Sequence, residues 1–454
     1  MEDWGYSEWD RQLDETRTTL ATDVSMMDRL YTCLLLLAVV FVAANQSLAD
    51  GVMRDGLGAI SGGRGGTNIG QFDNGAIIHD NPAAMVNVRG SGLNEFSVDA
   101  LLADLDYNEA DNPGVSADRK PYVLPYLSMI RKSEDEVWAY GLGIFAPAGF
   151  GAEYEMSNAG INPADPLREY EYESFAALAK VLPSLSVRLT DRLSLGGTLG
   201  VAISHAELEA PFLGQSGALA GVPTVMDLQG TGAALCWSLG LQYSLTNCTT
   251  VGVCYTSESR FDLDGSGKVE VAGLGQSRYD LEMGLTWPQS LGGGLRHQWN
   301  KRHVMSADVI WYDWSQAFDS LDLTFSNPDN PVFAGLLGPT VTDALPLDWR
   351  DTTSVRLGYE YSWLPCSVLR TGYIYHRNPV PASTLTPFIP ATLEHAITSG
   401  YGHRWRDRRF DIGYQFSFGS NNDVTNSSVV GGDFDNSSMD AAAHWLFLTC
   451  QQSF

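Results

Sequence analysis

Basic residues and long apolar runs are both scarce in this chain of 454 residues. It has 28 lysines and arginines against 54 acidic residues, which gives a formal net charge of −26. Binding to nucleic-acid phosphates needs a basic surface, so this charge argues against a nucleic-acid partner. The only long apolar run, residues 34–44, is shorter than the roughly 20 residues that a membrane-spanning helix needs.

That apolar run has the pattern of a secretory signal peptide. A basic residue precedes it, and Ser47-Leu48-Ala49 follows with small residues at the two positions that a signal peptidase reads. The first 25 residues are acidic and contain two tryptophans, which is unlike a leader. We therefore expect the true start at Met26 or Met27, a signal peptide that ends at residue 49, and a mature chain that begins near Asp50.

Cysteine is also scarce, and Cys33 lies within the predicted signal peptide. The remaining cysteines are Cys236, Cys248, Cys254, Cys366 and Cys450. Their odd number and the lack of a Cys-x-x-Cys spacing favour scattered free thiols over a disulfide framework or a metal site. The histidines are isolated, and no motif for catalysis or for a cofactor is present. The sequence therefore predicts a protein that is not an enzyme and needs no cofactor.

Glycine (46), tyrosine (19) and tryptophan (12) are abundant, which is typical of a protein with many strands, tight turns and aromatic girdles. Without a spanning helix, a membrane protein must be a closed barrel, because only then is every backbone group hydrogen-bonded in hydrocarbon. Alternation of apolar and polar residues, as in 192–204 and 410–418, predicts an all-β barrel of about 14 strands. The predicted strands are 90–107, 121–132, 136–154, 173–190, 192–208, 231–245, 248–263, 277–299, 302–325, 350–363, 366–378, 393–406, 408–420 and 439–454.

The connections between these strands alternate between short and long. Long segments are predicted at 108–120, 155–172, 209–230, 264–276, 326–349, 379–392 and 421–438, with turns of a few residues between them. Short periplasmic turns and long external loops are typical of barrels in the bacterial outer membrane. The chain ends on Phe454, and a terminal aromatic residue is what the outer-membrane assembly machinery recognises. We therefore predict that this machinery and the outer-membrane lipids are partners.

Residues 50–89 precede the first predicted strand and lack its alternation. They begin with the glycine-rich stretch Gly56–Asn68 and continue to Asn81-Pro82-Ala83. A flexible linker would be more polar than this segment, so a compact hatch that plugs the lumen is favoured. The predicted domains are thus the signal peptide, this hatch, and a barrel over residues 90–454.

The chain resembles the FadL/TodX family of outer-membrane transporters for hydrophobic substrates. The likeness covers nearly all of the mature sequence. Its motifs are the segment ending in Asn81-Pro82-Ala83, residues 285–294 with 306–315, and the ordered series Trp349–Thr352, Arg370–Tyr373, Asn378–Pro381 and Ile389-Pro390. The resemblance implies a monomeric barrel with the hatch in its lumen, an external apolar groove, an inner ligand pocket, and a kinked third strand that opens the wall sideways.

Pro147 and Gly149 lie in the third predicted strand and fit the kink. Proline removes a donor from the hydrogen-bond ladder and glycine weakens a strand, although the same residues also suit the external end of a strand. In the hatch, the resemblance makes Asn81, Pro82 and Ala83 the gate. We expect Asn81 to bond to backbone groups freed near the kink, while Pro82 fixes the turn.

The resemblance implies passive uptake of hydrophobic molecules, with long-chain fatty acids as the first candidate and aromatic hydrocarbons or alkanes as the alternative. A structural or adhesive barrel, a general porin and an outer-membrane lipase are the other readings. A porin needs an open, charged lumen, and nothing in the sequence marks a lipase nucleophile. Asp262-Leu-Asp264 lacks the spacing of a calcium loop and is predicted to be a solvated acidic loop. The cluster of Arg404, Arg406, Arg408 and Arg409 is predicted to be a solvated turn.

Overall fold

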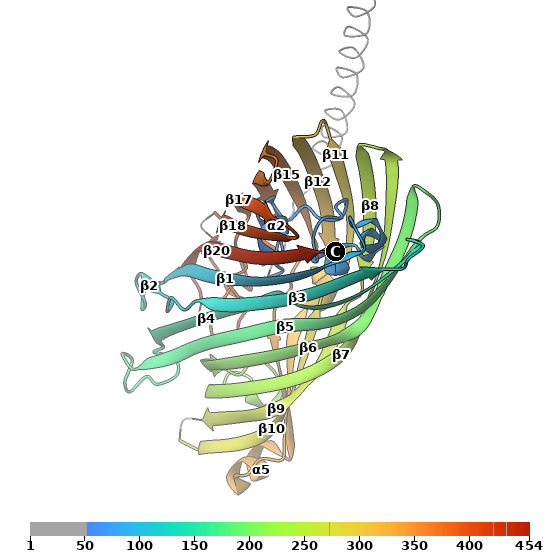
Figure 1. The fold of residues 1–454 in the computed structure, drawn as a ribbon. Helices are drawn as coiled ribbons and strands as arrows, with labels where there is room; N and C mark the ends of the chain where they lie inside the picture. Colours follow the sequence, from blue (N-terminus) through green and yellow to red (C-terminus); the bar gives the residue numbers. More distant parts are fainter. Residues whose placement is uncertain (1–51, 272, 421, 433) are drawn as a thin grey trace, which may run out of the picture. The chain divides into compact units, whose positions relative to one another are not determined.

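The computed structural model describes residues 52–271, 273–420, 422–432 and 434–454. The expected signal peptide, its cleavage site and the alternative start codons lie outside the described residues. Residues 48–454 form one compact unit, and all that follows concerns its described part (Figure 1). Among the described residues, no helix is long and apolar enough to cross a membrane.

The strands of this unit form one antiparallel sheet that closes on itself, because β1 pairs with β20 from Leu93↔Ser453 to Asn108↔Ser438. Closure pairs the first wall strand with the last, so neither of them is an open edge. The strands are β1 (Gly92–Asn108), β2 (Val115–Ser116), β3 (Tyr122–Lys132), β4 (Trp138–Ser157), β5 (Glu169–Arg188), β6 (Leu193–Leu213), β7 (Pro223–Thr246), β8 (Thr249–Thr256), β9 (Ser259–Val271), β10 (Gly275–Trp287), β11 (Ser290–Gln298), β12 (His303–Tyr312), β13 (Ser320–Ser326), β14 (Thr340–Pro346), β15 (Thr352–Leu364), β16 (Ser367–Tyr375), β17 (His395–Trp405), β18 (Arg408–Phe418), β19 (Asn422–Val424) and β20 (Ser437–Ser453).

Four neighbouring wall strands are each interrupted once, which gives the pairs β8/β9, β10/β11, β12/β13 and β14/β15. The members of each pair bond to the same neighbouring wall strand; β7, for example, pairs with both β8 and β9. Pro288 lies in one interruption, where its missing N–H cannot join the ladder. Counted as continuous strands, the wall has the 14 strands that the alternation predicts, and this fold class is confirmed.

Three of the predicted long loops are wrong in part. The segment 326–349 contains β14, which pairs with β13. β9 runs to Val271 and β10 begins at Gly275, so the segment 264–276 is mostly strand. β6 and β7 likewise shorten the segment 209–230 to residues 214–222. Asp262 and Asp264 are exposed on β9 and alternate with buried Phe261 and Leu263. β9 continues beyond the apolar band, so its outward residues are polar here. Their polarity resembles that of a loop, which explains the wrong prediction.

The wall has an apolar outer face and a more polar inner face. On β7, Leu235 and Leu239 are 74% and 61% exposed, whereas Ser238 and Gln242 between and beyond them are buried. Side chains of a strand alternate between faces, so the exposed set forms the outer surface of the ring. A continuous outer band of this kind is what a membrane barrel presents to lipid.

The N-terminal segment, residues 52–91, lies against the inner face of this wall (Figure 1). It contains the short helices α2 (Gly58–Gly62), α3 (Ile77–Asp80) and η1 (Pro82–Asn87). Ala59 donates its N–H to Thr449 of β20 at 2.8 Å, and Gln242 of β7 donates to the carbonyl of Gln71 at 3.0 Å. Because β20 and β7 are far apart around the ring, the segment reaches across the lumen. The remaining helices are η2 (Gly217–Leu219), α4 (Trp314–Ala317) and α5 (Pro331–Leu337).

Candidate functional site

The hydrogen-bond ladder on one side of β4 stops in the middle of the strand. β3 pairs with β4 from Lys132↔Ala139 only as far as Leu127↔Ile144. On the other side, the register with β5 shifts between Phe145 and Ala148, which is a β-bulge. Pro147 lies in this bulge and lacks the N–H that a regular ladder would use.

β4 continues ten residues beyond Pro147, to Ser157, so Pro147 and Gly149 are not at the end of a strand. Pro147 thus lies inside the β-bulge, and Gly149 follows it where β4 pairs with β5 but not with β3. Past Ile144, the edge of β4 next to β3 is left without a ladder partner from β3.

The start of the N-terminal segment occupies this edge. Arg54 donates its N–H to the carbonyl of Pro147 at 3.0 Å, and Gly149 donates to the carbonyl of Val52 at 3.2 Å. Met53 and Ala148 face each other as an isolated antiparallel bridge. Val52 and Arg54 thus bond to β4 where β3 does not, and Met53 lies opposite Ala148 between these bonds.

A cavity of 110 Å³ lies beside this contact. One side is formed by Val52 and Met53, and Gly149 and Phe150 of β4 also line it. Most of its other lining is aliphatic or aromatic: Leu101, Ala103, Leu105, Pro390, Ala391, Leu393, Ala442, Ala443 and Trp445. Burying apolar ligand surface contributes roughly 25 cal/mol per Å², so such a lining favours a hydrophobic ligand.

Polar groups also line this cavity, and the sequence did not identify them. Arg54 pairs with the buried Asp99 of β1, and its guanidinium lies 4.7 Å from the ring centre of Trp445. His376 also lines the cavity, and its Nε2 lies 3.6 Å from a carboxylate oxygen of Asp55. No local pattern marks these residues, because the fold brings them together from distant parts of the chain.

Asn81 is completely buried and does not bond near the kink, contrary to our expectation. Its side-chain amide donates to the carbonyl of Ile69 at 2.8 Å and to that of Leu241 on β7 at 3.1 Å. Its side-chain oxygen accepts the N–H of Ala83 at 3.2 Å, while Pro82 occupies the first turn of η1. The three residues therefore tie the N-terminal segment to β7, since that is where the buried amide finds carbonyl partners.

Glycines in the wall make room for this contact. A Cβ atom on Gly240 would lie 2.1 Å from the side-chain oxygen of Asn81, and one on Gly196 would lie 2.5 Å from the backbone nitrogen of Ala83. Such distances are far inside van der Waals contact, so any larger residue would push the segment away. Close approach of backbones is the reason that glycine is needed here.

Six buried or half-buried charges form a closed ring between the N-terminal segment and the wall. Their nearest oxygen–nitrogen distances run Arg64–Asp73 3.0 Å, Asp73–Arg409 3.9 Å, Arg409–Asp411 3.0 Å, Asp411–Arg370 2.9 Å, Arg370–Glu360 3.0 Å and Glu360–Arg64 3.0 Å. Burial alone would raise the pKa of Asp73, but Arg64 and Arg409 outweigh it and hold that pKa well below its usual range. We call this set the ionic ring.

The position of Arg409 in the ionic ring differs from the sequence prediction. Arg409 was predicted to lie in a solvated turn, but its side chain is only 11% exposed and pairs with Asp411. Phe410 on the next position points outward and is 45% exposed, so strand alternation turns Arg409 inward. Arg406 and Arg408 are exposed, as expected for a turn. The five described cysteines are all free, as predicted.

A closed antiparallel barrel with an apolar outer band and a segment inside its lumen defines a membrane barrel of the bacterial outer membrane. The chain belongs to the family described as outer membrane protein transport protein (OMPP1/FadL/TodX), whose model matches residues 39–454. The family consists of transport proteins, which does not support the lipase alternative. In outer-membrane barrels, the short turns generally lie on the periplasmic side.

Individual relatives are distant in sequence and similar in fold. A long-chain fatty acid transport protein of Escherichia coli O6:H1 is 23% identical over 361 residues, covering 71% of this chain and 77% of that protein. The solved structure of the Pseudomonas putida toluene transporter TodX has a TM-score of 0.75 at 22% identity, covering 88% of this chain and 99% of that one. A Pseudomonas aeruginosa FadL homologue has a TM-score of 0.72 at 17% identity, covering 89% and 100%.

Proposed function

We propose that the protein takes up hydrophobic molecules through the cavity beside β4 and releases them sideways at the interruption around Pro147 and Gly149. The observation that carries this proposal is the position of the apolar cavity, which is lined by Gly149 and Phe150 at the point where β3 stops pairing with β4. A hydrophobic molecule loses its burial energy in a watery lumen, so a route from an apolar cavity directly into lipid is favourable.

In this proposal, Val52–Arg54 act as the inner seal of the exit and Asn81, Pro82 and Ala83 hold the rest of the segment in place. Two backbone hydrogen bonds attach the seal to Pro147 and Gly149, and the Arg54 side chain adds a bond to the carbonyl of Ala146 at 3.0 Å and its buried pair with Asp99. A backbone hydrogen bond contributes about 1 kcal/mol net, so the backbone of Val52 and Met53 can detach from β4 while Arg54 stays paired with Asp99. The buried amide of Asn81 and the glycines facing it keep the lumen plugged while the seal moves.

Long-chain fatty acids are the substrate that we propose first. Arg54 and His376 line this mostly apolar cavity together with Asp55 and Ser417, and the guanidinium of Arg54 is the group that suits a carboxylate on an alkyl chain. The sequence relative named for long-chain fatty acid transport agrees with this choice. The proposed external apolar groove would deliver the ligand to the cavity.

A small aromatic hydrocarbon is the second candidate, and the size of the cavity favours it. The cavity has a volume of 110 Å³, below the roughly 300 Å³ at which drug-sized ligand pockets begin. Arg54 is already neutralised by Asp99 in the described structure, which leaves less charge for a carboxylate. The structural relatives TodX and the Ralstonia pickettii protein TbuX are both named toluene transporters.

The proposal is tested by restoring a regular strand with Pro147→Val and Gly149→Thr. Cells that lack their own transporter would express either protein, and uptake of labelled oleate and labelled toluene would be measured. We expect the substrate that uses this route to enter severalfold more slowly, with heat-modifiability on gels unchanged. The control is Pro183→Val on β5, a wall proline that pairs with Leu142 of β4 and does not line the cavity. Equal uptake by the parent and the double variant would refute the lateral exit.

A further inference from the structure

A second and larger cavity lies on the short-turn side of the N-terminal segment, which is generally the periplasmic side in outer-membrane barrels. Its volume is 440 Å³. Gln71 and Phe72 of the N-terminal segment line it, as do the turn at Lys301 and Arg302 and the turn at Leu364–Cys366. It shares no lining residue with the cavity beside β4. We call it the vestibule.

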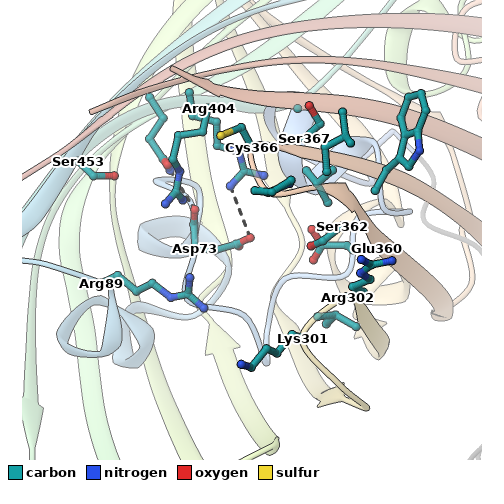
Figure 2. Close-up of a pocket in the computed structure, with 18 of the residues that line it drawn as sticks. Asp73, Arg89, Lys301, Arg302, Glu360, Ser362, Cys366, Ser367, Arg404 and Ser453 are labelled. Atoms are coloured by element: carbon teal, nitrogen blue, oxygen red, sulfur yellow. Dashed lines mark hydrogen bonds and ion pairs between the residues drawn. The ribbon is translucent and has the colours of Figure 1, made fainter. Parts of the chain in front are cut away.

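The charge of the vestibule is opposite to that of the protein. The chain carries a formal net charge of −26, yet the charged residues that line the vestibule are six cations and two acids. The cations are Arg89, Arg296, Lys301, Arg302, Arg404 and Arg409, and the acids are Asp73 and Glu360. Figure 2 shows Arg89, Lys301 and Arg302 on one side of the vestibule and Arg404 on the other, with Asp73 and Glu360 between them.

The two acids do not neutralise this excess, because both are engaged in the ionic ring. Asp73 pairs with Arg64 and Arg409, and Glu360 pairs with Arg64 and Arg370. By contrast, Arg89, Lys301, Arg302 and Arg404 have no ion-pair partner among the described residues. Arg296 lies with its guanidinium 5.0 Å from the ring centre of Phe72. The vestibule thus gathers positive charge that the described protein leaves unpaired.

Apolar side chains lie beside these cations. They are Phe72, Leu93, Val304, Trp363, Leu364 and Val368. Cations gathered around a concave surface attract an oxyanion, because their electrostatic potentials add up inside the concavity. Arginine is also the side chain best suited to two-point bonding of carboxylate or phosphate.

We propose that the vestibule is a binding site for an oxyanion, either a carboxylate or a phosphate group. Its ligand is a free small anion or the head group of an amphiphile whose chain lies on the apolar lining. The site stands apart from the proposed exit at β4, so it remains if that exit is wrong. An anion bound there lies next to the Asp73–Arg409 contact, the longest link of the ionic ring at 3.9 Å.

The test uses the purified full-length protein in a non-ionic detergent at low salt, with binding measured by calorimetry. The probes are inorganic phosphate, decanoate, and decanol as the uncharged counterpart of decanoate. The test variant is Arg302→Gln with Arg404→Gln, both exposed residues that line the vestibule. The matched control is Arg406→Gln with Arg408→Gln, which removes the same charge from exposed positions outside the vestibule.

We expect the test variant to bind an anionic probe at least tenfold more weakly than the parent, the control variant to bind like the parent, and decanol to show no difference. Loss of decanoate binding alone identifies an amphiphile head group, and loss of phosphate binding identifies a site open to free anions. The proposal is overturned if neither anion binds, or if both variants bind like the parent. Decanoate binding that survives in the test variant is assigned to the cavity beside Arg54, which keeps this outcome separate from failure of the proposed transport function.

Discussion

Replacing Arg64 with methionine should release the N-terminal segment from the wall without unfolding the barrel. The Arg64 side chain is fully buried and donates to Asp73, Glu360, Asn68 and the carbonyl of Thr67. Methionine keeps much of its volume but removes all these donors. Asp73 then loses its nearest cation, and Glu360 keeps only Arg370.

The size of this effect follows from the burial of the charges. Removing one partner of a buried pair costs about 3–5 kcal/mol, because the other charge stays buried without compensation. At 1.4 kcal/mol for each factor of ten, the population with a released segment should rise by roughly two to three and a half orders of magnitude. The barrel wall keeps its ladder, so this change should be local.

Hydrogen exchange over residues 56–75, measured together with ion conductance in planar bilayers, reports this release. We expect faster exchange in that segment, unchanged exchange in β5–β7, and more frequent opening to ions. The matched control is Arg119→Met, which breaks an ion pair with Asp104 whose arginine is 69% exposed and should change neither signal. If the two variants behave alike, the ionic ring does not hold the segment.

Three further outcomes follow. Gly240→Val should displace the segment at Asn81 and raise conductance, because its Cβ would lie 2.1 Å from the Asn81 oxygen, whereas Gly293→Val, with open space around its Cβ, should have little effect. Leu235→Arg, at a site 74% exposed on the outer face, should destabilise the barrel by about 2–4 kcal/mol in urea titrations, unlike Thr231→Arg nearer the external end. The pKa of Asp73 is lower in the folded protein than in a free aspartate. The stabilisation that its carboxylate gives to the ionic ring is therefore fully present above the ordinary aspartate pKa of about 3.9, and it is lost only as pH falls through the lower folded value. The difference in conductance between the parent and Asp73→Asn should therefore stay constant from pH 7 to pH 4, and loss of that difference within this range would contradict the assigned pairing.

Sequence reasoning predicted the wall well because a membrane strand repeats one simple physical pattern. Alternation identified all 14 wall strands, and the β-bulge of the third one contains Pro147. It failed at strand ends such as Asp262–Asp264, where the outer face meets water and turns polar. There, polar outward residues look like a loop, although buried partners such as Leu263 continue the alternation.

The groups around the two cavities could not be predicted in the same way. Arg54, Asp99 and Trp445 meet only because β1 and β20 close the barrel around the start of the N-terminal segment. The ionic ring likewise combines Arg64 with Glu360, which is 296 residues away in sequence. Asn81 was expected near the kink, but its carbonyl partners depend on which wall strands carry glycine opposite it. Local patterns carry no information about such register-dependent contacts.

The most direct test of the lateral route is a reversible disulfide between the seal and β4. Met53 and Ala148 face each other between the bonds Arg54–Pro147 and Gly149–Val52, a non-hydrogen-bonded pair whose spacing suits a disulfide. Met53→Cys with Ala148→Cys, in a background whose native cysteines are replaced by serine or alanine, would be assayed for uptake of labelled oleate and toluene before and after reduction. The account predicts that uptake is lost in the oxidised protein and returns on reduction, while each single-cysteine variant transports normally. Full uptake by the oxidised protein would contradict it.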